Sequence, residues 1–212
     1  MLQKETVEPR VLELLRALQA DSMFKHFHLA GGTGLALHLG HRRSADIDLF
    51  ATQQFNNEEY LQYLEKKYRF EADYTALNTI KGSIEKLKVD FITHEYLLLM
   101  PIVEEENIRI YSKEDIAAMK INAIAGDGTR SKDFVDLYFL LNNYSISDLL
   151  GFFGKKYSQR NTFHALKSLN YFNEVNLADW PVMIKENNLS WREVKASINK
   201  KCKEYFETNL KN

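Results

Sequence analysis

The segment from Phe27 to Phe50, FHLAGGTGLALHLGHRRSADIDLF, constrains the fold more than any other part of the chain. It ends in a DID triplet inside an apolar run, where isolated carboxylates are costly. A strand from Asp46 to Phe50 would place Asp46 and Asp48 on one face, because strand side chains alternate. Two like charges side by side favour a cation between them, and Mg²⁺ prefers carboxylates together with substrate phosphates. The triplet therefore predicts a site for a hard divalent metal ion, Mg²⁺ or Mn²⁺.

The residues before this triplet predict a phosphate site. Phe27 to Ala30 form a short apolar strand, Gly31 and Gly32 follow, and a helix is expected from about Thr33 to Leu39. Glycines let the backbone approach a ligand closely, and a helix start presents N–H groups to an anion. The glycines alone would favour a tight turn. With the DID triplet on the next strand, the pattern favours a cradle for a metal-bound nucleotide.

The order GG, helix, DxD and a later aspartate resembles the polymerase-β-type nucleotidyltransferase superfamily. The wording GGTGLALHLGHRRSADIDLF resembles the AbiEii/AbiGii toxin family more closely, as do KVDFI at 88–92 and SKEDIAAMKINAIAGDGTRSKDFVDLYFLL at 112–141. These matches span roughly residues 25–142. The resemblance implies transfer of a nucleoside monophosphate from an NTP to an RNA (tRNA by family resemblance) or protein acceptor. It also implies the toxin component of a toxin–antitoxin or abortive-infection system, with a cognate antitoxin as a partner.

A third carboxylate is expected at Asp90. In KLKVDFIT, residues 86–93, Asp90 alternates away from the apolar set. A solvated strand residue would explain Asp90 by itself. Together with Asp46 and Asp48 it would complete a two-metal site for an in-line displacement. Gly31, Gly32 and Thr33 would then hold the triphosphate.

Lys120 lies among alanines and isoleucines, so its ammonium requires a path to water or an anionic partner. The resemblance implies that Lys120 reaches the nucleotide phosphates. Asp133 and Asp136 share a helix face and are expected to meet Lys120 or the acceptor. Asp136 is the stronger candidate, because an acid in the first helical turn, such as Asp133, is favoured by the helix dipole alone. Arg42 and Arg43 fit equally a phosphate contact and a balance to the Asp pair.

Composition excludes several classes of protein. With 45% hydrophobic and 27% charged residues the chain is typical of a globular protein. The N-terminus lacks a signal core and the longest apolar run, Tyr96 to Val103, is too short to span a bilayer, so no membrane role and a cytoplasmic location are expected. A single cysteine, Cys202, excludes an internal disulfide.

The expected fold class is α+β, with a polymerase-β-like nucleotidyltransferase core on a mixed sheet, followed by helices. Residues 1–110 are expected to form the core, with a hairpin at 70–93 that turns at Gly82-Ser83. Residues 111–212 are expected to be helical, to complete the active site and to bind the acceptor.

The net charge of −1 argues against a generic nucleic-acid binder, but residues 151–212 hold 11 Lys/Arg against 6 Asp/Glu. Composition alone favours a solvated helical face there. An RNA acceptor would use some of its basic residues, namely Lys155, Lys156, Arg160, Lys167, Lys200, Lys201 and Lys203. Two alternatives stay open: a catalytically inactive module that binds a nucleotide or a partner, and an antibiotic-type nucleotidyltransferase with a small-molecule acceptor.

Overall fold

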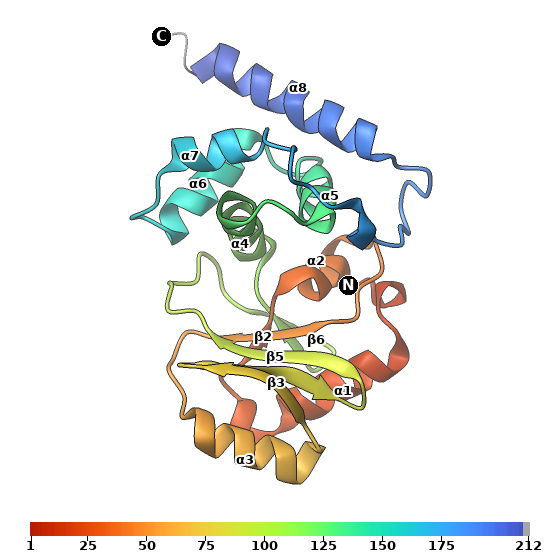
Figure 1. Cartoon of the computed structure of the whole chain (residues 1–212), viewed down its shortest axis with the longest axis vertical. Coiled ribbons are helices and arrows are strands. Elements are labelled where there is room, and N and C mark those ends of the chain that lie inside the picture. The colour runs from red at the N-terminus through yellow and green to blue at the C-terminus, as the bar shows by residue number, and fades with distance from the viewer. Residues whose placement is uncertain (210–212) are drawn as a thin grey trace. The chain divides into compact units, whose positions relative to one another are not determined.

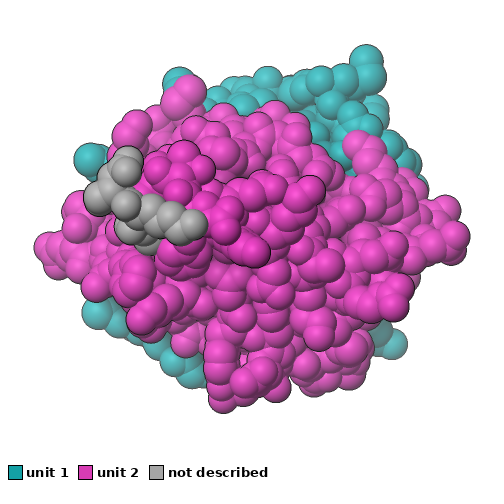
Figure 2. All heavy atoms as spheres, turned by 90° about the horizontal axis from the view of Figure 1, so that it is seen from above, with its two compact units in different colours: residues 1–97, 101–112 teal, residues 98–100, 113–212 magenta. Residues whose placement is uncertain are grey.

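The computed structural model describes residues 1–209, and the chain divides into two compact units. The first unit comprises residues 1–97 and 101–112 (Figure 2). The second comprises residues 98–100 and the chain from residue 113 onward. The short piece Leu98–Met100 thus belongs to the second unit, although residues of the first unit flank it in the sequence.

The first unit is built on a seven-stranded mixed sheet with the strand order β3-β4-β5-β2-β1-β7-β6. Strands β2 and β5 pair in parallel, as do β1 and β7, and the other neighbours are antiparallel. The strands are β1 (His28–Leu29), β2 (Ile47–Ala51), β3 (Glu71–Ala76), β4 (Thr79–Ile84), β5 (Leu87–Thr93), β6 (Val103–Glu105) and β7 (Ile108–Ile110). Three helices accompany this sheet, α1 (Pro9–Ala20), α2 (Gly31–Leu39) and α3 (Asn57–Tyr68). Helices α1 and α3 cover one face of the sheet, and α2 lies on the other (Figure 1).

Local sequence signals set the ends of these helices. Pro9 starts α1, where its missing N–H costs nothing and its fixed φ suits the first turn. The side chain of Asn56 caps α3 by accepting from the amides of Glu58 and Glu59. Helix α2 ends at Gly40, whose φ of 70° is the left-handed conformation that glycine adopts without a steric penalty. The short helix that carries the two glycines is therefore fixed at its far end as well.

The region 70–93 forms three strands, so the hairpin expected from the sequence is wrong. Gly82 lies inside β4, where an added Cβ would collide with the carbonyl oxygen of Glu71 on β3. The turns occur instead at Asn78, with φ of 54°, and at Lys86, with φ of 67°. Glycine thus serves here for close approach between strands, a use that cannot be distinguished from a turn without the neighbouring strand.

The second unit consists of helices, with α4 packing against α5, α6 and α7, and α8 contacting α5 and α6. These helices are α4 (Lys113–Gly126), α5 (Ser131–Leu140), α6 (Ile146–Lys156), α7 (Thr162–Ser168) and α8 (Trp191–Asn209). The expected α+β class, with a mixed sheet followed by helices, is confirmed. Within residues 1–209, no helix is both long enough and apolar enough to cross a bilayer.

A buried ion pair stabilises the second unit. Lys156 Nζ lies 2.7 Å from Asp115 Oδ1, and both side chains are fully buried. The same carboxylate accepts from the amides of Leu99 and Met100 at 3.0 to 3.2 Å. Asp115 therefore joins α4 both to α6 and to the piece Leu98–Met100, and its charge is balanced by Lys156 and by these backbone donors.

Removal of one partner of this pair should be strongly destabilising. We expect Lys156→Met to lower the free energy of unfolding by about 3–5 kcal/mol, because it leaves the carboxylate of Asp115 buried without its counter-charge. Lys200→Met is the matched control, since Lys200 is exposed and lies 4.0 Å from Glu204, and it should change stability by less than about 0.5 kcal/mol. Urea unfolding measures both, and a loss below about 1 kcal/mol for Lys156→Met would contradict this role.

Candidate active site

Asp48 and Asp90 lie side by side on the two central parallel strands. The register of β2 and β5 makes them direct Cα partners, so both side chains project from the same face of the sheet. Asp48 is half-buried and Asp90 is only 2% exposed. Strand β2 begins at Ile47, one residue later than expected, so Asp46 immediately precedes the strand. The sheet thus places Asp48 and Asp90 side by side, and Asp46 precedes Asp48 by two residues in the chain.

Two lysines flank the buried carboxylate. Lys81 is the Cα partner of Asp90 on β4, and its Nζ lies 3.4 Å from Asp90 Oδ2. The Nζ of Lys88, two residues earlier on β5, lies 3.8 Å from the same oxygen. Both lysine side chains are at least 40% exposed, so their charges offset the repulsion between the aspartates only in part. The second oxygen, Asp90 Oδ1, is buried without a hydrogen-bond partner.

The start of α2 lies next to the carboxylate of Asp48. The helix begins at Gly31, two residues earlier than expected, and Gly31 has φ of 61°. A Cβ added at Gly31 would collide with Asp48 Oδ2, and one added at Gly32 would collide with the guanidinium of Arg42. Ala30 at the N-cap provides no side-chain hydrogen bond to the first amides of the helix. Gly31 therefore lets the start of α2 approach Asp48 closely, and Gly32 leaves room for the guanidinium of Arg42.

Thr33 binds the backbone of Asp46 through its hydroxyl group. Its side chain is fully buried, and its Oγ1 donates to the carbonyl oxygen of Asp46 at 2.5 Å. The same hydroxyl lies 2.8 Å from Ser44 Oγ. The hydroxyl of Thr33 is thus used within the protein, and its backbone amide in the first turn of α2 is the group that can contact a phosphate.

The donor set has the chemistry of a site for Mg²⁺ or Mn²⁺. Three carboxylates are hard oxygen ligands, and the buried Asp90 Oδ1 has the vacant lone pairs that a metal ion would occupy. Among residues 1–209, however, no three His, Cys, Asp or Glu side chains are already arranged to hold a metal. The residues fit the metal by ligand type, while Lys81 and Lys88 contact the other oxygen of Asp90.

In the second unit, Lys120 is the centre of a buried charge cluster. Its Nζ lies 2.6 Å from Asp133 Oδ1 and 2.7 Å from Asp136 Oδ2. Lys120 is 7% exposed, Asp133 is 4% exposed and Asp136 is fully buried. Arg130 Nε lies 3.9 Å from the second oxygen of Asp133. Lys120 and Asp136, both predicted from the sequence, thus contact each other.

The sequence pattern underestimated three residues. Asp133 fits its place in the first turn of α5 without any partner, yet it binds Lys120 as closely as Asp136 does. Lys88 shares a face with Asp90 by strand alternation, a signal that was available in the sequence. Lys81 has no such signal, because its contact depends on the register of β4 against β5.

His28 lies on the face of the sheet that carries Asp48, since it pairs with Phe50 two residues farther along β2. Burial, together with the positive charges of Arg109 and His26, lowers the pKa of His28 to about 4. His28 is therefore neutral at pH 7. It adds no positive charge beside the carboxylates.

A mixed sheet with a glycine-started helix beside neighbouring aspartates defines a nucleotidyltransferase-like fold. Two solved structures share it at low sequence identity. MenT4, a nucleotidyltransferase toxin from Mycobacterium tuberculosis, has a TM-score of 0.60 and 14% identity, covering 89% of this chain and 79% of its own. JHP933 from Helicobacter pylori has a TM-score of 0.53 and 16% identity, covering 95% of this chain and 93% of its own.

The sequence identifies the family. The family described as nucleotidyl transferase AbiEii toxin, type IV TA system, matches residues 13–73 and 65–202. An uncharacterised protein of Aquifex aeolicus (strain VF5) is 30% identical over 201 residues, covering 92% of this chain and 95% of its own. The chain therefore belongs to the AbiEii nucleotidyltransferase toxin family.

Proposed function

We propose that this protein transfers a nucleoside monophosphate from an NTP to an acceptor, with Mg²⁺ or Mn²⁺ as cofactor. The observation that carries the proposal is the pairing of Asp48 with the buried Asp90, next to a helix start that only glycines allow. Carboxylates that hold a divalent metal, beside backbone amides that bind phosphate, are what nucleotidyl transfer requires.

Each group in the first unit has a role in this reaction. The backbone amides of Gly31, Gly32 and Thr33 bind the triphosphate at the positive end of α2. Asp46, Asp48 and Asp90 would hold the metal, and Lys81 and Lys88 contact Asp90 through its Oδ2. A metal held there would supply positive charge to the triphosphate.

The acceptor oxygen forms a bond to the α-phosphorus while the bond from that phosphorus to the bridging oxygen of the β-phosphate breaks. Pyrophosphate leaves with the electron pair. The proton of the attacking hydroxyl passes to water, because Asp46, Asp48 and Asp90 are assigned to the metal. An inactive binding module would not need these paired charges, so the enzyme is favoured over that alternative.

Conversion of Asp46 or Asp48 to asparagine should abolish transfer and leave the fold intact. Either change removes a like charge from the carboxylate pair, so without metal the melting temperature should hold or rise. At 100 times its Kd, Mg²⁺ should stabilise the wild type by about 2.7 kcal/mol and both variants hardly at all. Asp73→Asn, an equal charge change on the exposed strand β3, should behave as wild type.

Transfer is measured by incubating the protein with each radiolabelled NTP together with cellular RNA and protein, followed by separation of the labelled species. Full turnover by either asparagine variant would refute the metal assignment. Equal shifts with Mg²⁺ in wild type and variants would do the same. Labelled small molecules, with RNA and protein unlabelled, would support the antibiotic-type alternative.

Lys120 is proposed to contact a nucleotide phosphate, with Asp133 and Asp136 positioning its ammonium. Its buried Nζ lies 2.6 Å from Asp133 Oδ1 and 2.7 Å from Asp136 Oδ2. The same contacts mean that loss of Lys120 leaves two buried acids facing each other. A direct role of Asp136 toward the acceptor, expected from the sequence, would require Asp136 to exchange Lys120 for a new partner.

A double variant separates the structural role of Lys120 from the functional one. Lys120→Met should lower the free energy of unfolding by about 3–5 kcal/mol. Adding Asp133→Asn should restore part of this loss, because one unbalanced charge is removed. NTP binding should stay weaker by about 1.5–3 kcal/mol, the value of a charge-assisted contact. If urea unfolding shows rescue and transfer activity returns with it, Lys120 is a structural residue only.

The acceptor is proposed to be structured RNA, tRNA by family resemblance, bound through basic residues of the second unit. Lys155 near the end of α6, Arg160 between α6 and α7, and Lys167 on α7 are exposed. Lys167 lies over the ring of Phe163, itself 47% exposed, at 4.6 Å, and Arg160 lies 5.9 Å from the buried ring of Tyr157. Exposed cations suit nucleic-acid phosphates, and the exposed ring of Phe163 suits a base.

Two residues predicted for this surface are not suited to it. Lys156 is fully buried against Asp115, so its inclusion among the RNA contacts is wrong. Lys201 donates to the carbonyl oxygen of Leu141 at 2.8 Å and is only half-exposed. The RNA-binding proposal therefore rests on Lys155, Arg160 and Lys167, with Lys200 and Lys203 on α8 as further exposed cations.

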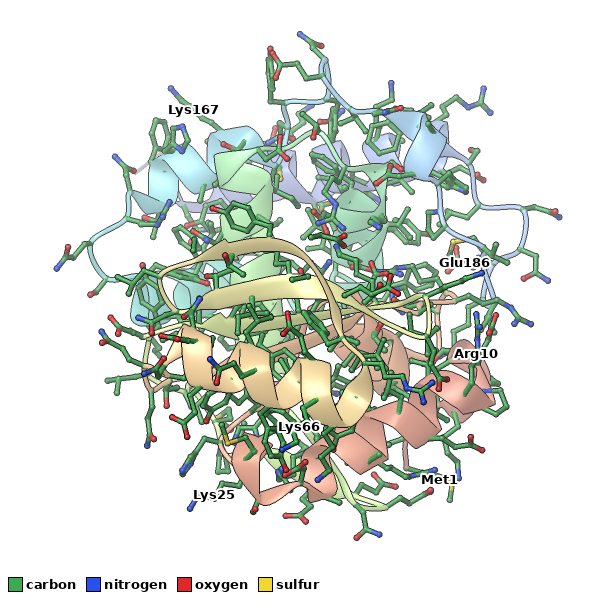
Figure 3. The ribbon with its side chains drawn as sticks, turned by 60° about the horizontal axis from the view of Figure 1, so that its bottom comes forward. Met1, Arg10, Lys25, Lys66, Lys167 and Glu186 are labelled. Atoms are coloured by element: carbon green, nitrogen blue, oxygen red, sulfur yellow. The ribbon has the colours of Figure 1, made fainter. Side chains whose placement is uncertain are left out.

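Charge reversal tests this surface. Lys155→Glu with Lys167→Glu should weaken RNA binding and flatten the salt dependence, by about 0.7 to 0.9 in log–log slope per lost phosphate contact. NTP affinity should not change. Lys25→Glu with Lys66→Glu, on the first unit (Figure 3), is the control with the same change of net charge. If both pairs reduce the slope equally, binding follows net charge, and the acceptor is a protein or a small molecule.

The family description also points to a cognate antitoxin as a partner. We place the reaction in the cytoplasm, where NTPs and RNA are both available. Co-expression with the product of a neighbouring small regulator gene would test the pairing, because only a cognate antitoxin should relieve growth arrest by the active protein.

A further inference from the structure

A chain of aromatic side chains begins beside the carboxylates. Phe50 follows Asp48 by two residues on β2, so it projects from the same face of the sheet about 6.6 Å farther along the strand. His94 follows the end of β5, and its amide donates to the carbonyl oxygen of Ala51 at 2.7 Å. This bond brings the ring of His94 next to that of Phe50, with centroids 5.8 Å apart and planes at 84°.

The series of rings is buried at one end and exposed to solvent at the other. Tyr111 is fully buried, and its ring centroid lies 6.3 Å from that of Phe50. Phe50 and His94 are half-buried. Tyr96 lies 4.7 Å from His94 between centroids and is 38% exposed. The series thus runs from a buried anchor at Tyr111 to an accessible edge at Tyr96.

Phe50 lies next to charged side chains on this face of the sheet. Its neighbours in the same row are Ile92 and His28, and the next row holds Asp48, Asp90 and Lys81. The hydrophobic core lies on the opposite face, with Ile47, Leu49 and Ala51. Phe50 therefore places an aromatic ring at the border of the charged site.

A nucleobase is the ligand that suits such a border. Bases stack on aromatic side chains whatever their sequence, because every base has a π face. In an NTP one ribose separates the α-phosphate from the base. If the α-phosphate lies at the carboxylates, the base lies one ribose away from it. This separation matches the spacing of about 6.6 Å between Asp48 and Phe50 along β2.

We propose that Phe50, His94 and Tyr96 form the subsite that binds the base of the NTP. This inference rests on the proposed nucleotidyl transfer and adds to it where the base lies. The aromatic surface stacks against the base, and the neutral ring of His28 completes the row behind Phe50.

The test compares two ligands that differ only in the nucleoside. Calorimetry with Mg²⁺ measures the Kd of each of the four NTPs and of inorganic tripolyphosphate. Tyr96→Ala and Phe50→Leu should raise the Kd of the preferred NTP about 5- to 100-fold, as expected for loss of a stacking partner. Both variants should bind tripolyphosphate within about two-fold of wild type. Tyr74→Ala is the control, because Tyr74 is 56% exposed on the edge strand β3 of the same unit.

Three results would overturn the subsite. Unchanged NTP affinity in both variants would do so, and if turnover with RNA then falls, the rings bind the acceptor instead. An equal loss for NTP and tripolyphosphate would indicate distortion of the phosphate site. A wild type that binds neither ligand would refute the proposed function together with this subsite, whereas binding of both ligands without an effect of the variants would refute the subsite alone.

Discussion

The pairing of Asp48 with Asp90 is the constraint on which the candidate site of the first unit depends. The parallel register of β2 and β5 fixes the two residues opposite each other, and burial of Asp90 reduces the screening of their like charges. Lys81 and Lys88 supply positive charge beside Asp90. The start of α2 approaches Asp48 so closely that a Cβ at Gly31 would meet its carboxylate.

The features predicted correctly from the sequence depend on local patterns, namely side-chain alternation along a strand and the residues at a helix start. Alternation along each strand separates Asp48 and Asp90 from the apolar residues of their own strands, and two glycines before a helical pattern predict a helix start after the first strand. Gly82 was misread because its close approach to Glu71 depends on the pairing of β3 with β4. Lys81 could not be linked to Asp90 for the same reason, since strand register is a tertiary property.

Charge patterns in the second unit show the same limit. Lys155 and Lys156 are adjacent in a basic segment, yet one is exposed and the other is buried against Asp115, 41 residues away in the chain. Lys120 was recognised because apolar neighbours indicated burial, and burial of an ammonium requires an anion. Asp133 was expected to meet Lys120 or the acceptor, but the helix dipole gave it a sufficient local explanation, so Asp136 was ranked above it.

The carboxylate of Asp115 accepts hydrogen bonds from the amides of Leu99 and Met100. Because of these bonds, no single cut in the sequence divides the chain into the two units. A fragment ending at residue 112 would carry Leu98–Met100 away from the carboxylate that satisfies its backbone. A fragment starting at residue 113 would retain a buried acid without those two donors. A cut of the chain between residues 112 and 113 would therefore separate Leu98–Met100 from the rest of the second unit.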